Sequence, residues 1–315
     1  MRDWLIEPGI GETRTVRLSG DAIAEARIQI DGMDRAGDIL QATLLTAGRP
    51  AVAVSGDEHF LLPKGAAGTT EGGSIFIEVT RERIPGGEPW KRPLARMADG
   101  ASQPQRAEIA GEVLPFPDSR DRLREGGWAD LLEEARSGVI GFDGGELRIY
   151  VTPAMTLIDV DGQLAPSDLA VRAAVAAAAA IVRHSIGGSI GIDFPTLSGK
   201  RDRRAVDETI DGALPQPFER TAVNGFGFLQ IVRPRRYAST FELAQDRPAF
   251  EARALLRRAA LAGPGPKELI CPEPVATVIK RKPEWVDTLG RQVGGPITLR
   301  AVPSLPIHGG DVVQA

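Results

Sequence analysis

The amino-acid sequence predicts a mixed α/β fold with a small β-barrel near the N-terminus, and three observations indicate it. Up to about residue 100, short segments of alternating apolar and polar residues are separated by Gly, Pro and Asp turns, the spacing of a barrel or sandwich. Residues 98–127 are rich in Pro, Gly and charge and show no sustained period. Beyond them, helical periods alternate with short apolar strands. We therefore expect a β-rich part followed by an α/β part.

The pattern divides the chain into five expected regions. These are N-terminal strands in 1–35, a five-stranded OB-like barrel in 36–100, a connector in 101–130, an α/β core in 131–262 and a partly ordered Pro/Gly-rich tail in 263–315. Within the core, WADLLEEARS predicts a helix, and GELRIYV with AMTLIDV predicts a hairpin. An Ala-rich helix begins near Ser167, the candidate N-cap, with Gly187 just past its end. Then follow a strand, GSIGIDF, a helix, KRDRRAVDETIDGAL, a strand, GFGFLQIV, and a helix, PAFEARALLRRAALAG.

Composition excludes several classes of protein. The 315 residues carry 38 Lys and Arg against 42 Asp and Glu, a net charge of −4, so the chain is not a polybasic nucleic-acid binder. The lone Cys271 forms no internal disulfide, and with three histidines it makes no ordinary Cys/His zinc site. No segment has the length of a signal peptide's apolar region or of a membrane span. We expect a soluble, cytoplasmic protein with no membrane partner.

Three aspartates stand at the ends of apolar strands. Asp159 and Asp161 alternate along one strand and so share a face, and Asp193 ends another strand. Converging carboxylates suit a hard divalent cation, magnesium or manganese, which can activate water and offset charge on a phosphodiester. The alternative is that these residues only begin turns or cap helices.

Two clusters of basic residues follow the strands of this region. The first comprises Lys200, Arg201, Arg203 and Arg204, and the second comprises Arg233, Arg235 and Arg236. We expect both at the edge of the sheet that carries the aspartates, where they can contact phosphates. The alternative is a solvated helix face, the common role of such charge runs.

Two further motifs have weaker context. Residues 187–191, GGSIG, match the G-x-S-x-G pattern of serine hydrolases, but Ser189 follows a helix and begins a strand, whereas a nucleophilic serine ends a strand and opens a helix. The only histidine downstream is His308. The GIG near residue 10 lacks the third glycine of a dinucleotide site and is typical of a turn.

At these residues the sequence resembles the ribonuclease E/G family. Four segments agree in order and spacing: AMTLIDVDG, GGSIGIDF, SGKRDRRAVDETI and FGFLQIVRPR. The resemblance covers residues 131–236 well and residues 1–97 loosely. It implies an α+β chain whose nuclease-type α/β catalytic core, RNase H-like in part, carries an inserted OB-fold that binds RNA.

The activity that this resemblance implies is cleavage of single-stranded RNA by a magnesium-activated water, leaving 5′-phosphate and 3′-hydroxyl ends. Asp159 and Asp193 match the family's metal-binding aspartates, and Asp161 stands where the family usually carries an asparagine. In the OB-like region, Phe60 is the obvious side chain for stacking on bases, since Val52 and Ser55 lie near positions where the family has aromatics.

The chain also departs from the family pattern. The region of the family's 5′-monophosphate sensor shrinks to some thirty residues, and of the Cys-Pro-x-Cys zinc link only Cys271-Pro272 remains. We therefore expect no sensing of the RNA 5′ end, no zinc, and a monomer or a dimer not held by a zinc link. The alternative function is a weak or inactive descendant that binds RNA or a partner protein without cleaving it.

Overall fold

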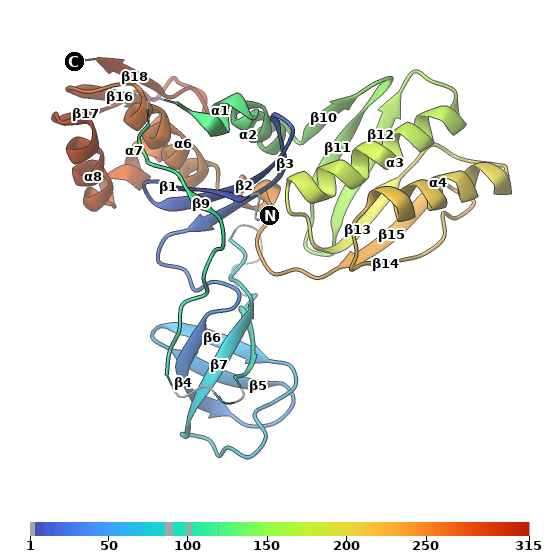
Figure 1. Cartoon of the computed structure of the whole chain (residues 1–315), viewed down its shortest axis with the longest axis horizontal. Coiled ribbons are helices and arrows are strands. Elements are labelled where there is room, and N and C mark those ends of the chain that lie inside the picture. The colour runs from blue at the N-terminus through green and yellow to red at the C-terminus, as the bar shows by residue number, and fades with distance from the viewer. Residues whose placement is uncertain (1–3, 86–90, 99, 101–102, 119, 315) are drawn as a thin grey trace. The chain divides into compact units, whose positions relative to one another are not determined.

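In the computed structural model, the described residues are 4–85, 91–98, 100, 103–118 and 120–314 (Figure 1). Parts of the expected N-terminal strands and barrel region, residues 1–3 and 86–90, lie outside them. The chain forms two compact units. The first comprises Met1–Asp31, Ala110–Ala129 and Leu243–Ala315, and the second comprises Gly32–Ile109 and Asp130–Glu242.

The second unit contains a closed five-stranded barrel. Its strands are β4 (Ile39–Thr46), β5 (Ala51–Ser55), β6 (Glu58–Leu62), β7 (Ser74–Arg81) and β8 (Leu94–Met97), joined in the order β4-β5-β6-β8-β7. Because successive side chains point to opposite faces of a strand, every second residue enters the core, as Leu44, Phe60 and Ile77 do. The predicted five-stranded barrel is confirmed.

The same unit contains a six-stranded mixed sheet that carries the three aspartates. Its order is β10-β11-β12-β13-β15-β14, with β10 (Val139–Phe142), β11 (Gly145–Val151), β12 (Thr156–Gly162), β13 (Gly188–Asp193), β14 (Glu219–Arg220) and β15 (Phe228–Arg233). Two helices, α3 (Pro166–Arg183) and α4 (Lys200–Ala213), share one core with the sheet and so cover one of its faces (Figure 1). The predicted hairpin, helices and strands of this region are confirmed.

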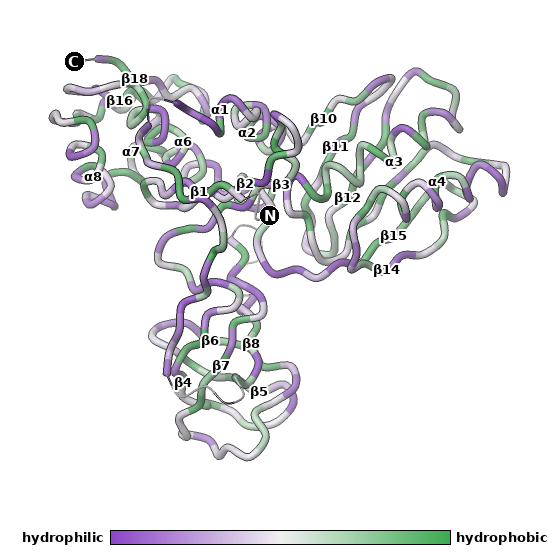
Figure 2. The backbone as a smooth tube through the Cα atoms, viewed as in Figure 1, coloured by the Kyte–Doolittle hydropathy of each residue, from purple (hydrophilic) through white to green (hydrophobic). Residues whose placement is uncertain are grey.

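Burial follows the two periods expected of strands and helices. Leu147, Ile158 and Ile190 point into the core beneath α3 and α4. The residues between core positions on β11 and β12 are half-buried or exposed, whereas Gly191 of β13 is also buried. The Ala-rich α3 is more hydrophobic than the largely hydrophilic α4 (Figure 2). The small side chains of α3 allow the helix to lie close to the sheet.

Both ends of α3 differ from the sequence prediction. The helix begins at Pro166, whose fixed φ suits the first helical position, and Ala165 is the N-cap, so the prediction that Ser167 caps the helix is wrong. At the other end, Ser185 and not Gly187 is the residue that takes the left-handed conformation directly after the C-cap, with φ 54°.

The helices α2 (Trp128–Ser137) and α5 (Thr240–Leu243) flank the end of α3 through a buried histidine. The Nε2 atom of His184 lies 2.9 Å from Glu134, its Nδ1 atom lies 2.6 Å from the Thr240 hydroxyl, and its ring lies 4.4 Å from that of Phe241. Burial lowers the pKa of His184 from its usual 6.5, although the hydrogen bond that Glu134 accepts from the ring acts in the opposite direction. The imidazole is therefore a neutral structural group.

The first unit contains a sheet of order β3-β2-β1-β9, formed by β1 (Trp4–Pro8), β2 (Glu12–Ser19), β3 (Ala22–Ile30) and β9 (Glu112–Val113). The helices α1 (Arg122–Glu125) and α6 (Arg247–Leu261) belong to the same unit. A buried network of charges connects α6 to this sheet. Arg253 donates to Glu12 over 2.7 Å, and Arg257 donates to Glu7 over 2.8 Å and to Asp121 over 2.6 Å.

The segment after Pro264 is ordered, so the expectation of a partly ordered tail is wrong. It forms β16 (Lys267–Cys271), α7 (Glu273–Lys280), α8 (Pro283–Val293), β17 (Ile297–Ala301) and β18 (Asp311–Gln314), with sheet order β17-β16-β18. Val275, Ile279 and Leu289 share a buried core with Leu255 of α6. The Pro and Gly residues lie mainly in the short connections between these elements, which the composition alone did not separate from a tail.

Within the described ranges, no helix is both long enough and apolar enough to span a membrane.

Candidate functional site

The central feature of the six-stranded sheet is a pair of adjacent aspartates. The strands β12 and β13 run parallel, and Asp159 and Asp193 are partners in their register. Neighbouring strands lie about 4.8 Å apart, so the two side chains leave the same face of the sheet side by side. That face is opposite α3 and α4, because Ile158 and Ile192 point into the helix-covered core. Asp159 is half-buried and Asp193 is exposed.

The third aspartate has a different partner. Asp161 lies two residues beyond Asp159 on the same face, and its Oδ2 atom is 3.7 Å from Nε of Arg148. Arg148 belongs to β11, where it is the register partner of Asp159, and it also binds Glu146. Both side chains of the Arg148–Asp161 pair are largely exposed. An arginine that sequence reasoning missed therefore offsets the charge of Asp161.

The donor set of this face fits a magnesium ion. Within the described ranges, no three His, Cys, Asp or Glu side chains form a group that could enclose a metal. Magnesium, however, keeps several of its waters and often takes only one or two protein carboxylates. Asp159 and Asp193 provide two such carboxylates on neighbouring strands, with access from solvent at Asp193. Asp161, beside Arg148, lies at the margin of this pair.

The surface around the carboxylates is shaped by Gly191. A Cβ atom there would lie 2.6 Å from Cζ of Phe228 and 2.9 Å from Sδ of Met155, so both side chains lie directly against the backbone of β13. Tyr150 of β11 and Val232 of β15 are exposed, at 51% and 49%. The face opposite α3 and α4 is therefore open, with apolar groups close to the carboxylates.

The first basic cluster follows the end of β13 at Asp193. A short connection leads from there to α4, which begins at Lys200, and Lys200 and Arg201 are exposed in its first turn. Arg203 instead donates to the carbonyl oxygen atoms of Leu197, over 2.6 Å, and Ser198, over 3.1 Å. It therefore holds the connection in place.

Arg204, the last residue of this cluster, forms an exposed pair with Glu208 over 2.8 Å, a type of contact that contributes little to stability. Of the four predicted cations, Arg203 and Arg204 bind within the chain, and Lys200 and Arg201 are exposed in the first turn of α4.

The second basic cluster does not lie at that end of β13, and this prediction is wrong. The strand β15 runs antiparallel to β13, so Phe228 is the register partner of Asp193 and Arg233 is that of Gly188. Five residues of strand, about 17 Å, separate the two ends. Arg235 follows Arg233 and binds the buried Glu242. Arg233 and Arg235 are therefore remote from the carboxylates. The prediction failed because the sequence alone does not show that β15 runs antiparallel to β13.

The start of β15 takes the place that the second cluster was expected to occupy. The residues 224–227 form a turn before Phe228, and Phe226 in this turn is 82% exposed. The sequence pattern predicts a strand from residue 225, but β15 begins at Phe228 and this turn precedes it. The signal in the sequence is the run Asn224-Gly225, a turn dipeptide, followed by Gly227.

Ser189 lacks the surroundings of a nucleophile. It lies inside β13 as the register partner of Val232, and the strand continues for four residues beyond it to Asp193. A nucleophilic serine of the G-x-S-x-G type stands instead on a sharp turn between a strand and a helix. The geometry gives no support to the serine hydrolase alternative.

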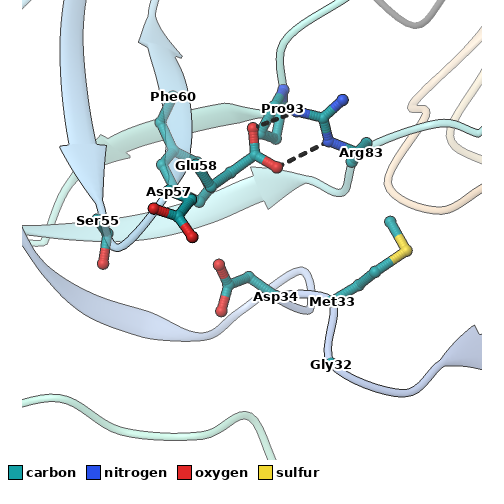
Figure 3. A pocket seen from close by; sticks show the side chains of 9 residues that line it. All are labelled: Gly32, Met33, Asp34, Ser55, Asp57, Glu58, Phe60, Arg83 and Pro93. Atoms are coloured by element: carbon teal, nitrogen blue, oxygen red, sulfur yellow. Dashed lines mark hydrogen bonds and ion pairs between the residues drawn. The ribbon is translucent and has the colours of Figure 1, made fainter. Parts of the chain in front are cut away.

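The barrel carries a pocket of about 470 Å³ with an acidic lining. Asp34 and Asp57 face its centre, and Glu58 is held there by two hydrogen bonds of 2.7 Å from Arg83 (Figure 3). Burial raises the pKa of Asp34 even though Arg106 acts to lower it, and the neighbouring Asp38 and Glu58 add to the rise. The pocket lining thus carries three carboxylates and one guanidinium, which is already paired with Glu58, and this excess of negative charge disfavours a phosphate there.

Phe60, the predicted stacking residue, also lines this pocket but is a core residue. Its exposure is 0%, and it packs inside the barrel with Leu44 and Leu62. Alternation along β6 points Phe60 inward, whereas its neighbours His59 and Leu61 point away from the core. The prediction that Phe60 presents an open ring to a base is therefore wrong.

Comparison with known proteins adds no family to these observations. No protein-family model matches the chain, and no curated protein matches it either.

Proposed function

We propose that the protein is an endoribonuclease that hydrolyses phosphodiester bonds of single-stranded RNA, with Asp159 and Asp193 as the metal-binding pair. The observation that carries the proposal is the register of β12 and β13, which makes these two aspartates neighbours on an open face. The resemblance of residues 131–236 to the ribonuclease E/G family supports the same assignment. In this proposal the six-stranded sheet with α3 and α4 is the nuclease core, and the barrel is an OB-fold.

Asp159 and Asp193 would hold a magnesium ion, or manganese in its place. The chemistry that the ion supplies is activation of a water molecule and neutralisation of the phosphate's charge. Water adds to phosphorus, the bond to the 3′ oxygen breaks, and that oxygen takes up a proton. The products are a 5′-phosphate and a 3′-hydroxyl.

The residues around the pair would position the RNA. Lys200 and Arg201 stand in the first turn of α4, where the helix dipole also favours an anion, and would contact backbone phosphates. Arg148 would reduce the repulsion between the RNA and the additional carboxylate of Asp161. The barrel pocket takes no part, because its carboxylates repel phosphate.

The experiment that tests this proposal is cleavage of a 5′-labelled single-stranded RNA with magnesium or with a chelator. We expect the wild type to cleave only with the metal, and Asp159→Asn and Asp193→Asn to lose cleavage while they remain folded. Asp287→Asn, at an exposed position of α8, is the matched control and should cleave normally. RNA that is bound but not cleaved with magnesium or manganese would contradict the proposal and leave an RNA-binding protein.

A further inference from the structure

Phe226 is the most exposed of the large hydrophobic side chains in the described residues. Its 82% exposure exceeds the 65% of Val113 and the 52% of Val175. An apolar ring on the surface gains free energy when a ligand removes it from water, by roughly 25 cal/mol per Å² of apolar area. A single exposed ring is too small an area for a stable protein interface, but it matches the face of a nucleobase.

The turn that presents Phe226 is held by its own hydrogen bonds. The side-chain oxygen of Asn224 accepts from the backbone N–H of Phe226 over 2.9 Å and from that of Phe228 over 3.0 Å. The backbone N–H of Gly227 donates to the Asn224 carbonyl over 3.2 Å. Gly227 has φ +96°, and a Cβ atom there would lie 2.3 Å from the Phe194 carbonyl oxygen. The ring therefore stands on a fixed backbone.

The same turn is attached to the strand that carries Asp193. The backbone N–H of Phe194 donates to the Gly227 carbonyl over 3.1 Å, and Asp193 is the register partner of Phe228. Phe226 thus lies two residues before Phe228, the strand neighbour of the proposed metal ligand Asp193. Lys200 and Arg201 follow the same end of β13.

We propose that Phe226 binds RNA by stacking on one unpaired base next to the bond that is cleaved. This inference rests on the proposed function, since it takes Asp159 and Asp193 as the place of cleavage. A base within a duplex is already stacked and paired, so its face is not available to the ring without unpairing. Phe226 would therefore select single-stranded RNA at the cleavage site, a role that the buried Phe60 does not fill.

The test compares Phe226→Ala, Phe226→Trp and the control Val175→Ala, which removes an exposed apolar side chain from α3. Loss of one stacked base costs a single-strand binder between about fivefold and about 100-fold in affinity. We expect Phe226→Ala to lower kcat/KM on single-stranded RNA by a factor in this range. Phe226→Trp should restore it, and Val175→Ala should match the wild type.

A set of RNAs, each with one abasic nucleotide, identifies the stacked base. For the wild type, one position near the cleaved bond should lower kcat/KM by about the same factor as Phe226→Ala. In Phe226→Ala the same abasic position should cause no further loss, because the ring and the base then form one interaction. Equal cleavage by wild type and Phe226→Ala, or losses that add, would overturn the inference and leave the nuclease proposal intact.

Binding separates the failure of this inference from the failure of the proposed function. If the wild type does not cleave, the dissociation constant for the same RNA with magnesium is compared between wild type and Phe226→Ala. Weaker binding by the variant would support stacking at this turn in a protein that is not a nuclease. Equal binding, or no binding by either, would overturn the stacking proposal as well.

Discussion

Asp159 and Asp193 are direct neighbours across the parallel strands β12 and β13, although 34 positions separate them in the sequence. Both side chains leave the face of the sheet that α3 and α4 do not cover. In the proposed function this arrangement would give a divalent cation two oxygen ligands on neighbouring strands.

Arg148 and Asp161 should be coupled in their effect on RNA binding. Arg148→Gln leaves the Asp161 carboxylate beside the phosphate without its 3.7 Å partner, so we expect KM for RNA to rise, by about tenfold. Asp161→Asn removes the repulsion and should lower KM. In the double variant the effect of Arg148→Gln should be smaller than in the wild type, as a double-mutant cycle on KM measures. Equal effects in both backgrounds would mean that the pair is not coupled.

Substitutions in the two basic clusters should differ in their effect on the salt dependence of RNA binding. Lys200→Ala should reduce the slope of log binding constant against log salt concentration by about 0.7, the value for one phosphate contact on a single strand. Arg236→Ala removes an exposed cation beyond the opposite end of β15 and should leave the slope unchanged. A titration of labelled RNA at several salt concentrations measures both slopes. A loss of slope in Arg236→Ala alone would contradict the assignment of the edge.

Removing one member of the buried charge network of the first unit should be strongly destabilising. Glu12 accepts from Arg14 and Arg253, both over 2.7 Å, and all three side chains are at least nine-tenths buried. Glu12→Ala leaves two buried guanidinium groups with one acceptor fewer, so we expect a loss of about 3–5 kcal/mol in the free energy of unfolding. Urea denaturation measures it. Glu112→Ala, which breaks an exposed pair with Arg122, is the control and should cost less than about 1 kcal/mol.

The same network predicts the response to acid. Burial by itself raises the pKa of Glu12, but Arg14 and Arg253 outweigh it and hold the pKa below its usual 4.5. Because the unfolded chain then binds the proton more readily, the stabilisation is complete above about pH 4.5 and is lost as the pH falls through the folded-state value. Thermal melting between pH 6 and pH 3 should show this loss in the wild type and a weaker one in Glu12→Gln.

His184 should make the stability of the second unit depend on pH, in a higher pH range than that of Glu12. Since burial lowers its pKa, the unfolded chain takes up the proton first, and stability falls as the pH drops below about 6.5. We expect the decline in melting temperature between pH 7 and pH 5 to be smaller in His184→Gln than in the wild type. An equal decline in both proteins would show that His184 is not the group responsible.

The sequence predicts the elements of this protein better than their directions. The periods of α3, α4 and the Asp-bearing strands are local properties and gave the correct elements. The pairing of Arg233 with Gly188 depends on β15 running antiparallel to β13, which no local pattern encodes. Phe60 illustrates a different limit: an aromatic residue on a barrel strand can face inward or outward, and a shift of one residue decides between them.

The segment after Pro264 shows why composition misled the prediction of its order. Its helices and strands are short, from the four residues of β18 to the eleven of α8, so Pro and Gly at their ends dominate the count. Its buried Lys267 donates to the carbonyl oxygen atoms of Pro264 and Gly265 and to the side chain of Gln314, and so joins β16 to β18. Such contacts arise only in the folded chain.

The measurement that tests the central claim most directly is metal-dependent cleavage by Asp193→Asn. Asp193 is exposed at the end of β13, so the substitution should leave the melting temperature unchanged while it removes one of the two carboxylates. We predict that the wild type cleaves single-stranded RNA with magnesium, and that Asp193→Asn loses at least about 100-fold in kcat while it still binds the RNA. Cleavage by Asp193→Asn at the wild-type rate would contradict the assignment of this face as the catalytic site.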